Sequence, residues 1–156
     1  KITSVKGAGP ADGVLSSGQN LLLGQFTFEG LTKKIGGTVK LTEVIFTVLK
    51  SNDVAVTNWK LLIPGTGAQM DCFVSGNTVS CPQIPDSIGT LTNPATTLQL
   101  QGTVLVSQGA QNAYLQVTIQ NAGSISSAGD VRWSDGVNEF TWVPLSTPVA
   151  TSTRFH

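Results

Sequence analysis

Three carboxylates lie close together in the stretch DVRWSDGVNEFTWVPL, near the C-terminal end of the sequence. They are Asp130, Asp135 and Glu139, and Trp133 and Trp142 stand among and beside them. A pair of carboxylates on either side of a sugar ring is the catalytic set of most glycoside hydrolases. The stretch therefore raises a carboxylate-based hydrolase as the first chemistry to weigh against a purely structural role.

The same stretch also has the pattern of a β-hairpin. Asp135-Gly136 favours a type I′ turn, and this register places Arg132 directly opposite Glu139. Cross-strand pairs of opposite charge stabilise a hairpin by about 0.2–1 kcal/mol. Asp135 then makes the turn and Asp130 begins the first strand, so each acid has a structural role. The other face is apolar and is expected to pack in the core: Val131, Trp133, Phe140 and Trp142.

Other reaction chemistry lacks the residues it needs. The only histidine is His156, the last residue, so Ser-His-Asp and Cys-His arrangements have no imidazole. The glycine-rich segment GAGPADG has no Gly-Lys-Ser/Thr and reads as a link rather than a phosphate loop. The oxygen-rich segments KSNDV and SAGD match no EF-hand pattern. We therefore expect no enzymatic activity, no metal and no cofactor.

The two cysteines, Cys72 and Cys81, stand at the ends of CFVSGNTVSC. Gly76-Asn77 favours a two-residue turn, since both residues tolerate positive φ. Cys72 then faces Cys81 in a non-hydrogen-bonded pair, with Cα atoms about 4.5 Å apart, which a disulfide accepts. The spacing predicts a Cys72–Cys81 disulfide and hence an oxidising, extracellular location. Two buried free thiols are the alternative, whereas a metal site needs more ligands.

Composition narrows the class of protein. Nine basic residues balance nine acidic ones, so the chain lacks the basic excess expected of a nucleic-acid or anionic-membrane binder. No apolar run is long enough to span a membrane. A chain of 156 residues with 12% charged residues and much Val, Thr, Ser and Gly is typical of a secreted or cell-surface β-domain.

Strict alternation of apolar and polar residues predicts strands. TLQLQGTVLV and AYLQVTIQ both show this period of two, and short turn-rich segments separate such runs. In TVKLTEVIFTVL the alternation changes phase near Glu43, which predicts a β-bulge. Only residues 85–92 allow a helical turn. We therefore predict one all-β domain over residues 1–156: an antiparallel β-sandwich of the Ig-like or jelly-roll type.

Two stretches carry a resemblance to a known family. The motif WSDG-x3-F-x-W-x-PL (residues 133–145) and the pair LLLGQFTFEG and VKLTEVIFTV resemble exported Ig-like β-sandwich domains of bacterial cell-surface proteins. More distantly, the chain is similar to fibre and pilus subunits that assemble by donated strands. The resemblance implies export, surface display and a structural or adhesive role, and it supplies no catalytic residues.

The expected function is an extracellular structural subunit of a filament, pilus, matrix fibre or surface layer. Copies of the chain would join by β-strand addition, in which a strand of one subunit extends a sheet of the next. Residues 1–19 are the expected donor segment. Within it, Ile2 and Val5 are the expected inward anchors, and Val14 and Leu15 are further expected contacts with the neighbouring subunit.

A binding module is the alternative function. In that case aromatic rings in an exposed row would stack on a glycan or attach the protein to a host surface. Trp59, Tyr114 and Trp142 are the candidate platform residues. This hypothesis requires that these side chains lie together on the surface.

Overall fold

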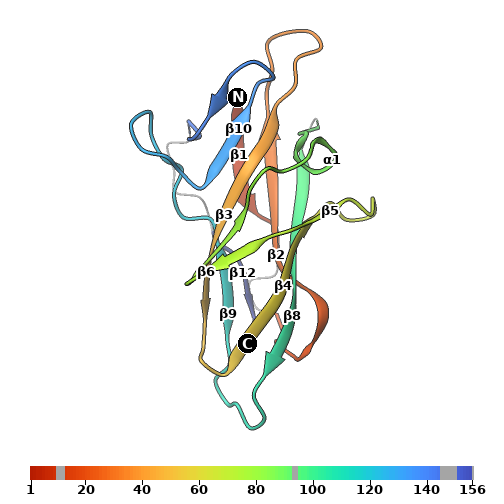
Figure 1. The fold of residues 1–156 in the computed structure, drawn as a ribbon, viewed down its shortest axis with the longest axis vertical. Helices are drawn as coiled ribbons and strands as arrows, with labels where there is room; N and C mark the ends of the chain where they lie inside the picture. Colours follow the sequence, from red (N-terminus) through yellow and green to blue (C-terminus); the bar gives the residue numbers. More distant parts are fainter. Residues whose placement is uncertain (10–12, 93–94, 145–150, 156) are drawn as a thin grey trace.

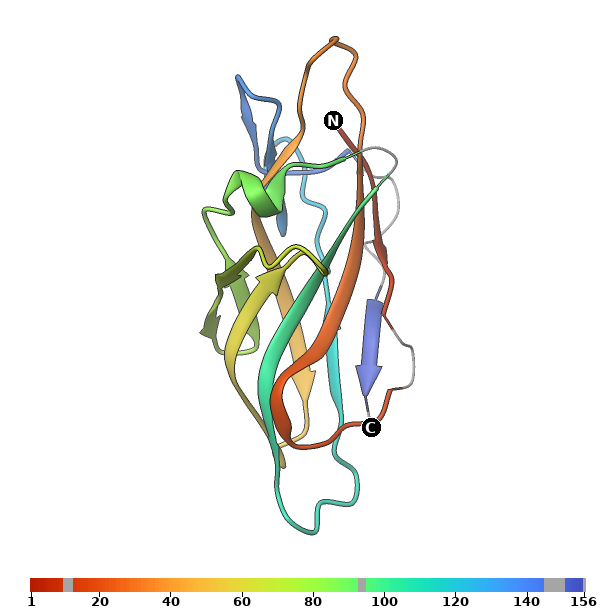
Figure 2. The ribbon, with the colours of Figure 1, turned by 90° about the vertical axis from the view of Figure 1, so that its right-hand side faces the viewer.

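The computed structural model describes residues 1–9, 13–92, 95–144 and 151–155. Figure 1 and Figure 2 show this part of the chain as an elongated sandwich whose longest strands run roughly along the long axis. Two antiparallel sheets and one short helix account for its regular structure. The prediction of a single all-β antiparallel sandwich is therefore confirmed. Leu145 of the WSDG motif and His156 lie outside the described residues.

The first sheet has five strands. Their spatial order is β1 (Ile2–Gly7), β2 (Gly18–Gly30), β8 (Thr96–Val106), β4 (Val54–Leu62) and β5 (Gln69–Asp71). The long β2 and β8 pair over most of their length, with Phe26 opposite Leu98 and Phe28 opposite Thr96. Strand β1 is one edge of this sheet and β5 is the other.

The second sheet has seven strands and is organised around β3 (Lys40–Lys50). The other strands are β6 (Phe73–Ser75), β7 (Thr78–Cys81), β9 (Leu115–Thr118), β10 (Val131–Ser134), β11 (Glu139–Phe140) and β12 (Thr151–Phe155). Val44 pairs with Cys81 of β7 and with Val131 of β10, so these two strands flank β3. Thr47 pairs with β7 and with β9 in the same way. Strands β9 and β10 therefore lie along the same side of β3.

The predicted irregularities are also present. The register between β3 and β10 shifts between Arg132 and Trp133, which face Glu43 and Leu41 and leave Thr42 as the extra residue. The phase change near Glu43 therefore marks a real β-bulge. The one helix among the described residues is α1 (Asp86–Gly89), within the segment where a helical turn was allowed.

The core fills the space between the sheets. Alternate residues of the long strands point inward, as the period of two requires. The rings of Phe26 from the first sheet and Phe46 from the second lie 5.2 Å apart between their centroids. Other fully buried side chains are Leu23, Phe28, Leu41, Leu61, Leu98, Leu100, Leu115 and Ile119.

One edge of the sandwich is closed by a strand that changes sheets. Strand β5 pairs with β4 in the first sheet, and β6, which follows after Cys72, pairs with β7 in the second. The amide of Cys72 donates to the carbonyl of Trp59 over 2.9 Å, which holds the crossing point to β4. We call residues 69–75 the strap. Strands that switch sheets in this way make the corners of a sandwich.

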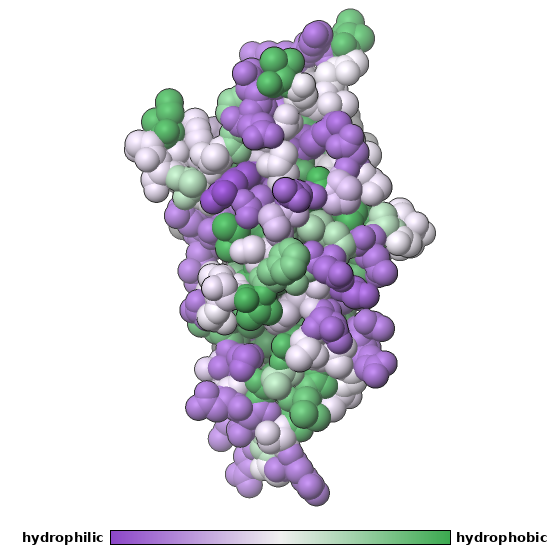
Figure 3. All heavy atoms as spheres, viewed as in Figure 1, coloured by the Kyte–Doolittle hydropathy of each residue, from purple (hydrophilic) through white to green (hydrophobic). Residues whose placement is uncertain are grey.

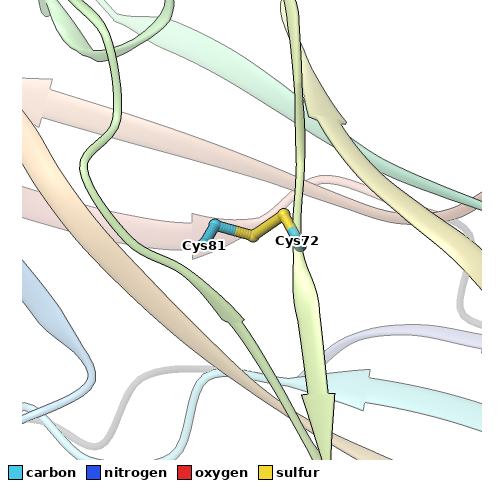
Figure 4. Close-up of a disulfide and its surroundings, with 2 residues drawn as sticks. All are labelled: Cys72 and Cys81. Carbon is cyan, nitrogen blue, oxygen red and sulfur yellow. A yellow bond between two sulfur atoms is a disulfide. The ribbon is translucent and has the colours of Figure 1, made fainter.

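The Cys72–Cys81 disulfide ties the strap to β7 (Figure 4). The two Cα atoms are 4.6 Å apart, and the hairpin pairs Phe73 with Ser80 and Ser75 with Thr78. The predicted turn, register and disulfide are therefore all confirmed. This edge of the sandwich is closed covalently.

The opposite side of the sandwich is closed by the two ends of the chain. Strand β1 pairs with β2, and β12 pairs with β9. Gly13 and Phe155 form a single parallel bridge between the two chain ends. A Cβ atom on Gly13 would lie 2.5 Å from Cδ1 of Phe155, so only glycine leaves room for this ring. We call β1, Gly13 and β12 together the terminal edge.

Loss of the disulfide should lower the free energy of unfolding. Closing so short a loop stabilises a protein by about 2.5 kcal/mol in the chain-entropy model. We expect the Cys72→Ala/Cys81→Ala variant to lose at least this amount in urea unfolding followed by Trp fluorescence. Because Cys81 is fully buried, unfolding of the native chain in dithiothreitol separates loss of the cross-link from loss of packing. An unchanged midpoint on reduction would show that the strap needs no covalent tie.

Candidate functional site

Asp130 holds together the base of a long loop. Its Oδ2 accepts hydrogen bonds from the amides of Gln120 at 3.3 Å and Asn121 at 3.0 Å. Its own amide donates to the carbonyl of Asn121, and its carbonyl accepts from Ile45 of β3. Residues 119–130 therefore leave the sheet between β9 and β10 and return to it at one point. This carboxylate has a structural role.

Asp135 caps its own turn. Its Oδ1 accepts from the amides of Val137 at 2.9 Å and Asn138 at 2.7 Å. These backbone hydrogen bonds lower the pKa of the exposed carboxyl. Asp135 itself pairs with Asn138, which makes Gly136 and Val137 the centre of the turn. The predicted turn at Asp135-Gly136 is therefore wrong by one residue.

The shifted turn changes every pair in the hairpin. Trp133 faces Phe140 and Ser134 faces Glu139, so Glu139 is not opposite Arg132. Arg132 instead binds Glu43 of β3, with 2.7 Å between Nη1 and Oε2. The predicted Arg132–Glu139 pair is wrong, because β3 lies beside β10 and presents Glu43 at the matching register position. Glu139 is exposed and lines an open hollow of about 510 Å³ with Arg132 and Glu43.

The aromatic residues of the hairpin are packed against each other. Trp133 is buried and its ring stacks on Phe140, with 4.2 Å between the ring centroids. Its Nε1 donates to the carbonyl of Trp142 over 2.9 Å. Val131 is also buried, while Phe140 and Trp142 are half-buried. The expected core face of the hairpin therefore holds for its first strand and in part for its second.

The candidate glycan platform does not form a row. Trp59 is buried in the core, with 4% of its surface exposed, whereas Tyr114 is 38% exposed. Both line a groove of about 310 Å³ beside the β6–β7 hairpin. Trp142 belongs to the β10–β11 end of the second sheet. The sugar-stacking hypothesis thus lacks the exposed row of rings that it requires.

The predicted subunit contacts occupy different environments. Ile2 and Val5 are 0% and 6% exposed and belong to the chain's own core. Val14 is 87% exposed and Leu15 is half-buried. In this structure, Ile2 and Val5 anchor their own sheet, and they are not available to a neighbour unless β1 leaves it.

Apolar side chains are exposed along the strap. Phe73 and Val74 are 63% and 55% exposed on β6, which is an edge of the second sheet. Figure 3 shows hydrophobic surface gathered on this face over β6 and the lower part of β4. Phe73 and Val74 are exposed because the β6–β7 hairpin places β6 at the edge of the second sheet. The sequence pattern alone does not indicate this edge position.

Basic and apolar side chains meet at one end of the molecule, around a hollow of about 560 Å³. Lys1, Lys33, Lys34 and Asp135 line it, together with Leu31 and Val137. We call this end, including Ile35 at the tip of the β2–β3 loop, the lysine pole. The segment KKIGG has the pattern of a turn, and no local sequence signal indicates that the fold places the Asp135 hairpin and Lys1 beside it.

The described residues contain no group of three or more His, Cys, Asp or Glu side chains able to hold a metal ion. In the same part of the chain no helix has the length and apolarity to cross a membrane. Comparisons with protein-family models, curated proteins and solved structures found no significant match. The resemblance to exported surface domains therefore stays a prediction.

Glu43 and Glu139 form a matched pair for testing the corrected register. Glu43→Gln removes the charge that binds the half-buried Arg132, and we expect it to lower the free energy of unfolding by about 1 kcal/mol. Glu139→Gln should change it by less than about 0.5 kcal/mol, as surface substitutions do. Urea unfolding of both variants measures the difference. If Glu139→Gln lowered the free energy of unfolding more than Glu43→Gln, the result would show that Arg132 pairs with Glu139 in solution.

Asp135 should make stability depend on pH in the acid range. Its folded pKa is lower than its unfolded pKa of about 3.9. The carboxylate therefore contributes stability above the unfolded pKa, which is lost as pH falls through the folded pKa. We expect the amide NMR signals of Val137 and Asn138 to titrate below the usual Asp range. Asp135→Asn keeps an acceptor oxygen and should abolish that titration, whereas an ordinary Asp pKa would contradict the capping role.

Proposed function

We propose that the chain is an exported, non-catalytic structural subunit of a cell-surface assembly, such as a filament, pilus, matrix fibre or surface layer. Its copies join by exchanging a terminal strand, so that β12 of one subunit pairs with β9 of the next. The observation that carries the proposal is the difference between the two sides of the sandwich. The disulfide closes the strap side, whereas the ends of the chain close the terminal edge.

The C-terminal strand is the better donor of the two. Releasing β1 would withdraw Ile2 and Val5 from the core and break a strand pair that runs from Ile2 to Gly7. Strand β12 has Phe155 as its described buried anchor, 9% exposed, with the ring over Gly13. The burial of the two N-terminal anchors therefore shifts the proposed donor from residues 1–19 to Thr151–Phe155.

Strand exchange preserves the bonds that the strand already makes. A β12 strand from a neighbour would form the same antiparallel ladder with β9, from Leu115 opposite Phe155 to Thr118 opposite Thr151. The backbone groups that its departure exposes are those that a sheet edge presents for strand addition. Because donor and acceptor surfaces differ, each subunit has one of each, and the contact propagates into an open chain when the rotation between subunits does not close a ring.

Export is supported by the cysteine chemistry. Both cysteines of the chain are in the disulfide, and such bonds persist in oxidising compartments outside the cytosol. The carboxylates support a non-catalytic role, since Asp130 and Asp135 cap backbone amides and Glu43 binds Arg132.

A cysteine pair tests the exchange directly. Gln116 of β9 faces Arg154 of β12, so Gln116→Cys/Arg154→Cys places one thiol on each side of the ladder. If β12 is exchanged, oxidation should link successive chains, and non-reducing gels should show a ladder of multimers. Size-exclusion chromatography of the native chain, which lacks the two added cysteines, should show the same assemblies over a range of concentrations.

The single variants are the controls for this experiment. Gln116→Cys or Arg154→Cys alone has one added thiol and should give nothing larger than a linked dimer. If the double variant gives only monomer-sized product and the native chain stays monomeric at high concentration, β12 stays with its own β9 and the proposed assembly fails.

A further inference from the structure

The lysine pole is built from two projecting turns. The β2–β3 loop extends beyond the rest of the molecule at one end of its long axis in both ribbon views (Figure 1, Figure 2). Gly36 has a φ of 75°, and Gly37 donates to the carbonyl of Lys34, which bends the chain tightly behind Ile35. The turn of the β10–β11 hairpin lies beside this loop, because Asp135, Gly136 and Val137 line the same hollow.

The tips of both turns carry aliphatic side chains in full contact with solvent. Ile35 is 101% exposed and Val137 is 87% exposed, while Leu31, at the base of the loop, is 54% exposed. Figure 3 shows hydrophobic surface at this end of the molecule. A single exposed aliphatic residue is ordinary on a protein surface, but a group of three at one end of the molecule, two of them lining one hollow, indicates an interaction surface.

Positive charge surrounds these tips. Lys33 and Lys34 immediately precede Ile35, are exposed, and take part in neither ion pair of the described residues. Lys1 lines the same hollow. Among the residues that line the hollow the acid is Asp135, whose carboxylate accepts hydrogen bonds from the amides of Val137 and Asn138. The pole therefore presents lysine ammonium groups and bare aliphatic tips together, although the whole chain has no net charge.

We propose that the lysine pole binds the surface of an anionic lipid bilayer. Ile35 and Val137 enter the interface between headgroups and acyl chains, and Lys33, Lys34 and Lys1 contact the headgroup phosphates. Interfacial binding elements combine aliphatic side chains with lysines in this way. A soluble acidic polymer would use the lysines but would leave Ile35 and Val137 in water, so the exposed tips favour lipid.

This binding would be separate from strand exchange. Strand β12 lies in the half of the molecule away from the β2–β3 loop (Figure 2), so both functions can operate in one subunit. The pole would then hold the long axis of a subunit upright on the membrane surface, with β12 left free.

Vesicle co-sedimentation of the full chain tests the lipid contact. We expect binding to phosphatidylcholine vesicles that contain phosphatidylglycerol, little binding to phosphatidylcholine alone, and weakening with added salt. Lys33→Gln/Lys34→Gln should reduce the affinity for anionic vesicles by about tenfold or more. Ile35→Ser, with both lysines intact, should reduce it by about tenfold as well, because one aliphatic side chain no longer enters the interface.

Matched controls use the same residue types elsewhere. Ile125 is 88% exposed on the loop between β9 and β10, and Lys6 is exposed on β1. Ile125→Ser and Lys6→Gln should keep native affinity, and unchanged Trp fluorescence of every variant should show that folding is retained. Absence of binding to anionic vesicles overturns the proposal. So does binding that Ile35→Ser leaves unchanged and that a soluble polygalacturonate abolishes, since that result identifies an acidic glycan site.

Discussion

The sandwich depends on one stretch of backbone that belongs to both sheets. Residues 69–75 pair with β4 and then with β7, and the amide of Cys72 continues the β4 ladder at the point of crossing. Two sheets packed face to face can separate at their edges wherever no chain joins them. The strap removes this freedom on one side, and the bond from Cys72 to Cys81 fixes it at the crossing. In the part of the chain that the structure describes, the opposite side has no such covalent tie and is closed by the two chain ends.

Strand β3 distributes this constraint through the second sheet. It is the strand against which β7, β9 and β10 all align, and its bulge at Thr42 sets which residues face β10. The ion pair between Arg132 and Glu43 follows from that register. Glu43 on the central strand β3 is therefore the partner of Arg132, although the local sequence favours a partner within the hairpin.

The two hairpins show how far the sequence predicts the structure. The turn at Gly76-Asn77 was predicted correctly, because Gly76 adopts the positive φ that the turn needs and the two cysteines fix the same register. The turn at Asp135-Gly136 was misplaced, because the carboxylate of Asp135 accepts two amides downstream and moves the centre of the turn. Strand alternation and the bulge were local properties and were predicted. The lysine pole joins segments distant in sequence, so no local pattern revealed it.

The loop held by Asp130 has a practical consequence. Hydrogen bonds between Asn121 and Asp130 join its two ends. The strands that it connects, β9 and β10, both pair with the same side of β3. Ile125 at its far end is solvent-exposed and outside the core. Segments whose ends are tied together tolerate added sequence, since an insertion at the tip does not alter the spacing of the ends. Residues 124–127 therefore offer a position for an epitope tag or a grafted peptide that leaves the sandwich unaltered.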